Sequence, residues 1–593
     1  MRNLWVAALA LAFNPRSCAA EVVVNLKNGK RLGLSTTGPS AFRVRFLDQV
    51  DGDDEYAAGP GLESPMVRPD EPDAAFTTKL EGDKVEIEAH FGSLAVSRSA
   101  STFTLLNAAK TVITQSQPID MKLEDMQLKL SASTAARLYG RGASEDDAGV
   151  LLLSGVNSPA VENKKSFVPH YFCTDGYAAL AAVDRTVGQV KDNGLAASYE
   201  LKDGAITWTT KGHFELYLMP ADSLDRGTQA YFKLIGPARV PPLYAFGFIA
   251  SRWGWKDSKY IKETLEAFRS GSFPIDAIIG DFEWFTNVSD YTFPPEGFPW
   301  YSDFGYGKAT FPDPQAQFKE YLKDYKIHFG GIRKPRLGNT AMLQHARDKG
   351  WLLPGEEAAA QVPSEPYGYA QNRNLNYTKP DVRSWYIEKQ KHYYDDGVSF
   401  WWNDEGETSY FTFHWWNEAH VKTLQEVDPT RRYFALNRAF TPGMARLGAT
   451  VWTGDIHNTW EDLQKTPGFM LNWALAGAPY VGCDTGGFFG NTTGQLLTRW
   501  MQVAAFMPIM RVHSTLEAVP HFPFLFPDYA AVLREALNIR YRLAPYHYSL
   551  AHKMYETQLL WMRPLFAEFP ADAATANLAS QWMDGDLLVA PVL

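Results

Sequence analysis

Residues 400–407 read FWWNDEGE, a short aromatic run that ends in three acids within four positions. A buried strand that runs into a solvated turn would give the same letters. Residues 451–463, VWTGDIHNTWEDL, repeat the arrangement, because Asp455 follows an apolar run and lies beside tryptophans. Two carboxylates can share the breaking of a glycosidic bond, and aromatic rings stack on the apolar faces of a sugar. The two stretches together therefore indicate sugar chemistry.

The chain around these stretches alternates strand-like and helical runs from about residue 240, for example at 277–280, 314–325, 327–332 and 381–394. About eight such β-then-α units predict a (β/α)8 TIM barrel with insertions. A barrel places its functional site at the C-terminal ends of its strands. Six polar residues stand where a strand-like run stops: Asp281, Asp404, Arg438, Asp455, Asp484 and His513.

The chain before residue 239 has a different pattern. Short runs rich in Val and Phe, such as 42–47, 84–89 and 93–97, are separated by turn residues such as 27–30 and 81–83. Many short strands at close spacing, without helical periods, predict an N-terminal antiparallel β-sandwich.

Length and composition limit the class of protein. The chain has 593 residues, too many for one domain, and is rich in aromatic residues with 18 Trp, 28 Tyr and 36 Phe. Its net charge of −10 argues against a nucleic acid or an anionic membrane as partner. No stretch is long enough to be a membrane helix, so we expect no membrane span.

The first 20 residues have the features of a secretory signal. Arg2 supplies the positive end, residues 4–13 the apolar run and residues 18–20 a small-residue cleavage site. We therefore expect the chain in the secretory-pathway lumen or secreted. Asn287, Asn376 and Asn491 lie in Asn-x-Ser/Thr sequons that a eukaryotic host could glycosylate.

Cleavage of this signal would leave two cysteines, Cys173 and Cys483. One long-range disulfide is an alternative, but two free thiols are the preferred interpretation. No spacing of Cys and His suggests a metal site.

Short motifs follow one another from residue 252: RWG at 252–254, IDAIIGD at 275–281, WNDEGE at 402–407, WTGD at 452–455, GCDTGGF at 482–488, RVHS at 511–514 and RYRLAPY at 540–546. In this order they resemble the catalytic barrel of family 31 glycoside hydrolases, which includes α-glucosidases and α-xylosidases. The resemblance continues at RPLF, residues 563–566, and at residues 585–593, which look like the start of that family's C-terminal β domain.

With this resemblance, we expect four segments. They are a signal peptide at 1–20, the β-sandwich at 21–238, the barrel at 239–556 and the start of a truncated C-terminal β domain at 557–593. In the family this last domain continues well beyond such a stretch. We therefore expect a fragment or an incomplete gene model, and a protein that has dispensed with the distal domains is the alternative.

The resemblance implies a retaining α-glycosidase. Asp404 matches the nucleophile, which would form a covalent glycosyl ester, and Asp455 matches the acid/base residue. Asp404 must then be ionised while Asp455 starts protonated, and burial and the neighbouring charge would raise the pKa of Asp455. The chemistry needs no metal and no cofactor.

The resemblance also implies residues that bind the substrate carbohydrate: Asp281, Trp402, Arg438, Trp452, Asp484, Phe488 and His513. Each has a structural alternative, such as a helix cap for the acids, a salt bridge for the arginine and core packing for the rings. Arg446 is a second candidate for the arginine position. Glu407 is expected to bond neighbouring backbone.

Residues 332–336, IRKPR, depart from the family by placing three cations after the third barrel strand. A solvated loop, or cations that pair with Glu283 and Glu405, is the preferred interpretation, and an anionic sugar is the alternative. We expect a hydrolase that cleaves α-linked sugars. An α-glucan lyase or a transglycosylase would use the same two aspartates, and a non-catalytic carbohydrate-binding relative is the third possibility.

Overall fold

The computed structural model describes residues 21–47, 64–68, 73–119, 126–183, 197–210, 214–285, 304–308, 310–338, 341–356 and 373–593. The predicted signal at 1–20 and the sequon at Asn287 lie outside these residues. Secretion and glycosylation therefore stay predictions.

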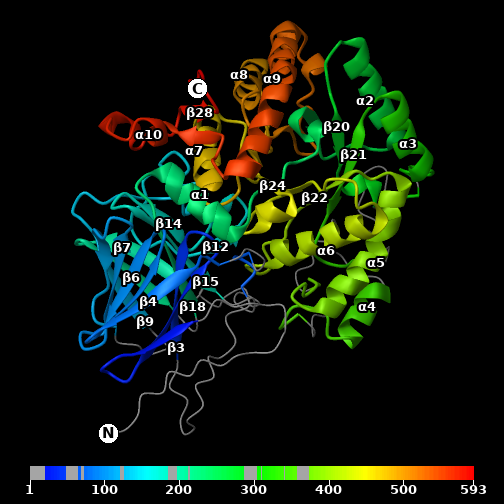
Figure 1. Cartoon of the computed structure of the whole chain (residues 1–593). Helices are drawn as coiled ribbons and strands as arrows, with labels where there is room; N and C mark the ends of the chain where they lie inside the picture. The colour runs from blue at the N-terminus through cyan, green and yellow to red at the C-terminus, as the bar shows by residue number, and fades with distance from the viewer. Residues whose placement is uncertain are drawn as a thin grey trace.

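Eight parallel strands form the predicted barrel, which lies beside the N-terminal sheets (Figure 1). They are β19 (Phe248–Ser251), β20 (Ala277–Gly280), β21 (His328–Arg333), β22 (Phe400–Asn403), β23 (Ala435–Asn437), β24 (Ala449–Trp452), β25 (Val481–Gly482) and β26 (Met510–Val512). Neighbours in the chain are neighbours in the sheet from β19 to β25, and β26 pairs with β19. The backbone N–H of Ile509 donates to the Val481 carbonyl at 3.3 Å, which joins the segments of β25 and β26 and closes the ring.

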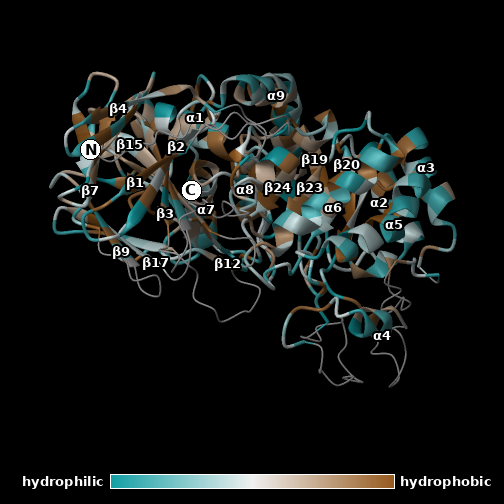
Figure 2. Ribbon diagram, turned by 60° about the horizontal axis from the view of Figure 1, so that its bottom comes forward, coloured by the Kyte–Doolittle hydropathy of each residue, from teal (hydrophilic) through white to brown (hydrophobic). Residues whose placement is uncertain are grey.

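Helices cover the outside of this ring: α2 (Ser258–Ser270), α3 (Pro314–Asp324), α5 (Pro380–Asp396), α6 (Thr412–Val427), α7 (Trp460–Leu475), α8 (Gly494–Ala504) and α9 (Ala530–Thr557). Helix α4 (Ala341–Asp348) lies between β21 and β22 in the chain and is set apart from the ring. Asp257, Asp313, Thr459 and Thr493 start four of these helices, because each side chain accepts a backbone N–H of the first turn. Figure 2 shows hydrophobic colour on the strands β19, β20 and β24 and much hydrophilic colour on α3 and α5. The apolar residues of these strands, such as Ile249, Ile278 and Val451, are buried.

The N-terminal part is built from antiparallel sheets, as predicted. A seven-stranded sheet holds, in order, β1 (Val22–Asn25), β2 (Arg31–Thr37), β3 (Ala41–Leu47), β18 (Phe214–Pro220), β15 (Tyr177–Val183), β14 (His170–Cys173) and β10 (Leu138–Tyr139). A five-stranded sheet of β4 (Phe76–Glu81), β5 (Lys84–Ala89), β6 (Gly92–Ser97), β7 (Thr102–Asn107) and β8 (Val112–Gln115) packs on it through contacts of β5 with β2 and of β7 with β18. A three-stranded sheet holds β16 (Ser198–Lys202), β17 (Ala205–Thr210) and β9 (Met126–Ser131), and helix α1 (Leu224–Ile235) follows the seven-stranded sheet.

Two small sheets complete the described chain. β11 (Gly142–Ser144), β12 (Ala160–Glu162) and β13 (Lys165–Phe167) form a sheet that contacts α7 of the barrel. Near the C-terminus, β27 (Met562–Pro564), β28 (Trp582–Asp584) and β29 (Leu587–Val589) form the antiparallel sheet that the sequence predicted, with α10 (Leu565–Glu568) between its first two strands. The Asp584 carboxylate bonds His547 Nε2 of α9 at 2.9 Å, which fastens this sheet to the barrel.

The two cysteines of the described chain, Cys173 and Cys483, are free thiols and are buried, which confirms the preferred interpretation over a disulfide. The Asn376 amide is buried, and its oxygen accepts bonds from Thr378, whereas Asn491 is exposed. No helix in the described part of the chain has the length and apolar character needed to cross a bilayer.

Gly468→Ala tests how closely the barrel packs on the N-terminal part. A methyl group at Gly468 of α7 would lie 1.9 Å from the carbonyl oxygen of Ala148. Helix propensity alone predicts a gain of about 1 kcal/mol, but overpacking costs about 1–3 kcal/mol, so we expect net destabilisation in urea denaturation. Gly149→Ala, with nothing within 4 Å of the added methyl group, is the control and should change stability little. Equal stability of the two variants would contradict this packing.

Candidate active site

The six polar residues at predicted strand ends do meet at one end of the barrel. Each follows the last residue of its strand or lies within three positions of it: Asp281 after β20, Asp404 after β22, Arg438 after β23, Asp455 after β24, Asp484 after β25 and His513 after β26. Since parallel barrel strands all end at the same face, the fold alone brings these side chains together.

Arg438 lies between the two candidate catalytic acids. Its Nη1 is 3.1 Å from Asp404 Oδ1 and 3.3 Å from Asp455 Oδ2. Its Nε and Nη2 donate to the two carboxylate oxygens of Glu407 at 2.7 and 3.0 Å. A fork of this kind is the strong, bidentate form of an arginine–carboxylate contact. Glu407 was expected to bond neighbouring backbone, but its carboxylate accepts from the Arg438 side chain and orients it.

The second candidate arginine, Arg446, has a structural role. It donates to the carbonyl oxygens of Ile235 and Pro65 at 2.8 and 2.9 Å. The described contacts thus place Arg438, and not Arg446, beside both acids.

Lys334 forms an ion pair with Asp404 Oδ2, and its side chain is only 2% exposed. Its Nζ also lies 3.2 Å from Glu405 Oε1, and Arg336 pairs with the other oxygen of Glu405. The solvated-loop interpretation of 332–336 is wrong for these two cations, while pairing with Glu405 is confirmed. The sequence showed the charge directly after a strand but did not indicate that the nucleophile candidate would be its partner.

Glu405 holds Asp404 in position through the backbone. Its φ is 55°, in the left-handed region that a non-glycine residue rarely adopts, and its N–H donates to Asp404 Oδ1 at 2.9 Å. Burial would raise the pKa of Glu405, but the charges of Lys334, Arg336 and Arg438 outweigh it and hold that pKa well below its usual value. The ion pairs therefore stabilise an otherwise costly backbone conformation.

Asp455 has the environment of a proton donor. Burial raises the pKa of its carboxyl to about 6, against the opposing charge of Arg438, and the negative charge of Asp404 adds to the rise. An acid that remains partly protonated near neutral pH beside a second carboxylate is the arrangement that general acid catalysis needs.

A buried pair forms another side of the site. Arg511 Nη1 donates to Asp484 Oδ1 at 2.5 Å, and both side chains are fully buried. The guanidinium lies over the rings of Trp402 and Trp452, at 4.5 and 5.3 Å from their centroids. Burial raises the pKa of Asp484 to about 8, although the charge of Arg511 opposes it.

His513 connects several of the predicted binding residues. Its ring stacks on Phe488 at 5.0 Å and meets the edge of Trp402 at 4.8 Å. Its Nδ1 bonds Ser251 Oγ at 2.8 Å, and its Nε2 lies 3.8 Å from Asp281 Oδ2. Burial lowers the pKa of His513 well below its usual value, so the ring is neutral.

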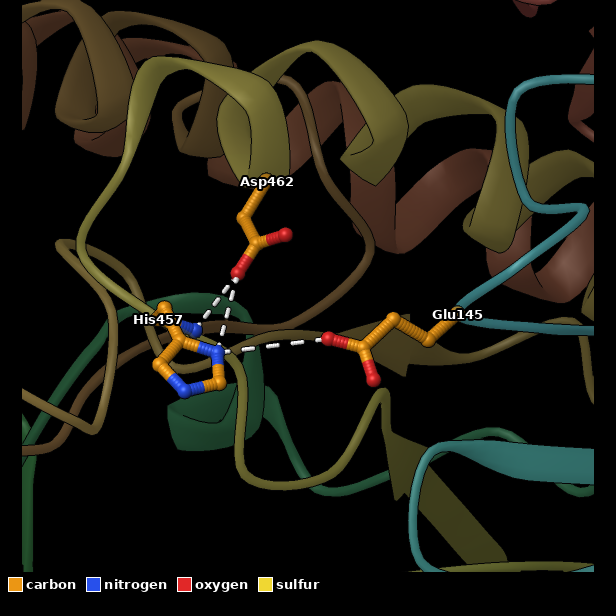
Figure 3. A group of neighbouring side chains, drawn as sticks. All are labelled: Glu145, His457 and Asp462. Atoms are coloured by element: carbon orange, nitrogen blue, oxygen red, sulfur yellow. Dashed lines mark hydrogen bonds and ion pairs between the residues drawn. The ribbon is translucent and has the colours of Figure 1, made fainter.

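Asn163 reaches the site from the N-terminal part, at the turn between β12 and β13, and bonds Asp455. Sequence reasoning missed it, because the two residues are 292 positions apart and no local pattern joins them. Near this contact, Glu145, His457 and Asp462 come close enough to hold a cation (Figure 3). Lys164 pairs with Glu145, and a carboxylate oxygen of Asp462 accepts the backbone N–H of His457 at 2.6 Å. Both carboxylates therefore already have partners within the protein.

Comparison with known proteins agrees with the fold. Residues 238–550 match the Glycosyl hydrolases family 31 TIM-barrel domain. The chain belongs to glycoside hydrolase family 31. It is 28% identical to human Neutral alpha-glucosidase AB over 439 residues, which span 67% of this chain and 44% of that protein. It is 26% identical to Alpha-glucosidase 2 of Bacillus thermoamyloliquefaciens over 584 residues, 86% of this chain and 70% of that one.

The fold is shared with solved family members. The structure superposes on the family 31 alpha-xylosidase from a soil metagenome complexed with xylose, with a TM-score of 0.81 and 22% identity over 96% of this chain and 90% of that one. It also superposes on the Flavobacterium johnsoniae family 31 dextranase, with a TM-score of 0.80 and 19% identity over 97% and 74% of the two chains. At these identities the likeness establishes the fold and not the substrate.

Lys334→Met should destabilise the protein more than loss of a surface lysine does. Removal of one partner from a buried ion pair costs about 3–5 kcal/mol, because Asp404 and Glu405 would lose a compensating cation. The matched control is Lys262→Met, since Lys262 pairs with Glu320 at 2.6 Å on the surface and solvent screens that pair. Chemical denaturation at neutral pH measures both. Equal midpoints for the two variants would contradict the structural role of Lys334.

Proposed function

We propose that the chain is a retaining α-glycoside hydrolase that cleaves neutral, α-linked sugars through a covalent glycosyl-aspartate intermediate. The observation that carries this proposal is the position of Arg438, whose one nitrogen contacts both Asp404 and Asp455. Family membership adds support, because the curated relatives named above are α-glucosidases.

The contacts of Arg438 limit the separation of the two acids. Asp404 Oδ1 and Asp455 Oδ2 can be no farther apart than the sum of their contacts with Nη1, 3.1 and 3.3 Å. Retaining glycosidases hold their carboxyl groups about 5–5.5 Å apart, and inverting enzymes about 6.5–9.5 Å apart to leave room for a water. The bound applies to this pair of oxygens and includes the separation that retaining enzymes use, so the geometry is compatible with retention.

In the first step, a carboxylate oxygen of Asp404 bonds to the anomeric carbon as the bond to the leaving oxygen breaks. The proton on Asp455 moves to that leaving oxygen. Arg438 stays paired with Glu407 throughout and so remains in position as charge leaves Asp404.

In the second step, the Asp455 carboxylate removes a proton from water, and the water oxygen bonds to the anomeric carbon. The ester bond to Asp404 breaks, and two inversions leave the sugar in its original α configuration. The raised pKa of Asp455 suits a group that donates and then accepts a proton.

Several buried groups can hold the sugar. Asp484 Oδ2 is buried and makes no hydrogen bond to any residue that the structure describes, so it can accept a bond from a hydroxyl. Asp281 and His513 follow β20 and β26 and lie close together, with 3.8 Å between His513 Nε2 and Asp281 Oδ2, and Trp402 and Trp452 provide aromatic surface. We propose these residues as the binding site for the terminal sugar.

The charges favour a neutral sugar over the anionic alternative. Lys334 and Arg336 pair with Asp404 and Glu405, Arg438 pairs with three acids, and Arg511 pairs with Asp484. Lys334, Arg336 and Arg438 thus already have anionic partners, and an anionic substituent would have to compete with a buried carboxylate.

The pH dependence follows from the pKa of Asp455. This residue must be protonated for the first step, so kcat/KM should fall about tenfold per pH unit above about pH 6. Rates with an α-glycoside measured between about pH 4 and 9 test this. In Asp455→Ala, assayed with an activated aryl glycoside, the fall in kcat/KM above about pH 6 should disappear. A profile that stays flat well above pH 6 in the unmodified protein would contradict the assignment.

Asp404→Ala tests the nucleophile. Removal of a nucleophile typically costs on the order of 10⁴-fold or more in rate, so the variant should be close to inactive. An activated 2-deoxy-2-fluoro or 5-fluoro α-glycoside should label Asp404 in the unmodified protein, and peptide mass spectrometry would locate the adduct. A label on another carboxylate, or full activity of Asp404→Ala, would exclude this nucleophile. No label and no turnover from a folded protein would favour a non-catalytic binding role.

A further inference from the structure

Asn163 makes two hydrogen bonds with Asp455. Its Nδ2 donates to Asp455 Oδ2 at 2.8 Å, and its Oδ1 accepts the backbone N–H of Asp455 at 3.1 Å. The second bond fixes the orientation of the amide, because only the oxygen of an Asn side chain can accept from a backbone N–H. The NH2 group must therefore face the carboxylate.

Buried contacts hold the turn that carries Asn163 in place. Ser166 of β13 accepts the backbone N–H of Phe440 at 3.1 Å, and Tyr410 donates to the carbonyl of Phe167 at 3.2 Å. Ser166 is fully buried. These bonds connect the N-terminal part to segments that follow β22 and β23, so the position of Asn163 does not depend on a free loop.

The backbone before Asp455 is shaped to receive this turn. Gly454 has a φ of 84°, and a methyl group there would lie 2.4 Å from Asn163 Oδ1 and 2.7 Å from the backbone nitrogen of Lys164. Only a glycine adopts this conformation and leaves room for the amide. The turn at Asn163 and the backbone at Gly454 thus fit closely together, directly before Asp455.

Asp455 Oδ2 receives a second donor, Arg438 Nη1, at 3.3 Å. Neither the Arg438 guanidinium nor the Asn163 NH2 group can accept a hydrogen bond. A proton on Oδ2 would point at one of these donors, whereas a proton on Oδ1 would not. The oxygen that faces two donors is therefore the unprotonated one when Asp455 is neutral.

We propose that Asn163 is a positioning residue for the acid/base Asp455. Asn163 and Arg438 both donate to Oδ2 of Asp455, so that Oδ1 carries the proton and transfers it to the leaving group. This inference rests on the proposed hydrolase function. It makes the N-terminal β part a contributor to proton transfer and not only a support for the barrel.

Two consequences distinguish this role from simple packing. A hydrogen bond donated to a carboxylate stabilises its ionised form, so loss of the Asn163 donor should raise the pKa of Asp455. If the Asp455 carboxyl group is no longer held in one orientation, proton transfer to the leaving group should also be slower. Hydrolysis should then slow for substrates whose leaving group needs that proton, such as a sugar. An activated aryl leaving group departs without much help from an acid, and its rate should change less.

The test compares Asn163→Ala, Asn163→Asp and Lys164→Gln in the full chain. Lys164 lies in the same turn and pairs with Glu145, so its variant controls for docking of the turn. We expect Asn163→Ala to move the alkaline limb of kcat/KM upward by about one pH unit. We also expect its kcat/KM to fall about tenfold or more on a disaccharide, and less than about threefold on a 4-nitrophenyl glycoside of the same sugar.

The Asn163→Asp variant should move the limb further upward, because a carboxylate beside Oδ2 repels the ionised form of Asp455. Lys164→Gln should match the unmodified protein. The same shift in the pKa of Asp455 should be seen without turnover, by 13C NMR of protein labelled at the Asp carboxyl carbon, with the signal assigned by Asp455→Asn.

An unchanged alkaline limb and an unchanged Asp455 titration in Asn163→Ala would overturn the inference, as would equal losses on both leaving groups. Full activity of Asp404→Ala would instead refute the proposed function, and the NMR titration would still decide the role of Asn163.

Discussion

The positive charge of the Arg438 guanidinium allows three carboxylates to lie close together in the site. Three carboxylates, from Asp404, Glu407 and Asp455, contact this one group. Without a cation between them, three acids at such spacing would repel one another strongly in a buried setting. The barrel supplies the geometry, since β22, β23 and β24 are consecutive neighbours and carry the nucleophile candidate, the arginine and the acid at their ends.

The two candidate catalytic acids, Asp404 and Asp455, each have a neighbour in the chain with a positive φ. Glu405, directly after Asp404, has a positive φ and is stabilised by Lys334 and Arg336. Gly454, directly before Asp455, also has a positive φ and fits against the turn at Asn163. Only the backbone at Glu405 is strained, and ion pairs stabilise it there, whereas Gly454 adopts its φ without strain and lets the N-terminal part contact Asp455.

The sequence was sufficient for the barrel and for the residues at its strand ends, because strand length, alternation and the C-terminal-face rule are local properties. It was not sufficient for the partners of those residues. Lys334 was visible as a cation after a strand, but letters alone do not distinguish a solvated lysine from a buried one. Asn163 and Asp455 meet only through packing between separate sheets, and the fork between Glu407 and Arg438 depends on side-chain directions. Long-range contacts of this kind leave no periodic signal.

The most direct test of the account is an NMR time course of an α-glycoside panel, from glucosides to xylosides, with Asp404→Ala alongside. The contacts of Arg438 predict that the first sugar released is the α-anomer and that the variant releases none. Release of the β-anomer first would mean that the two acids act across a water and would contradict the retaining geometry. An unsaturated product in place of the free sugar would show elimination from the same site and would contradict hydrolysis.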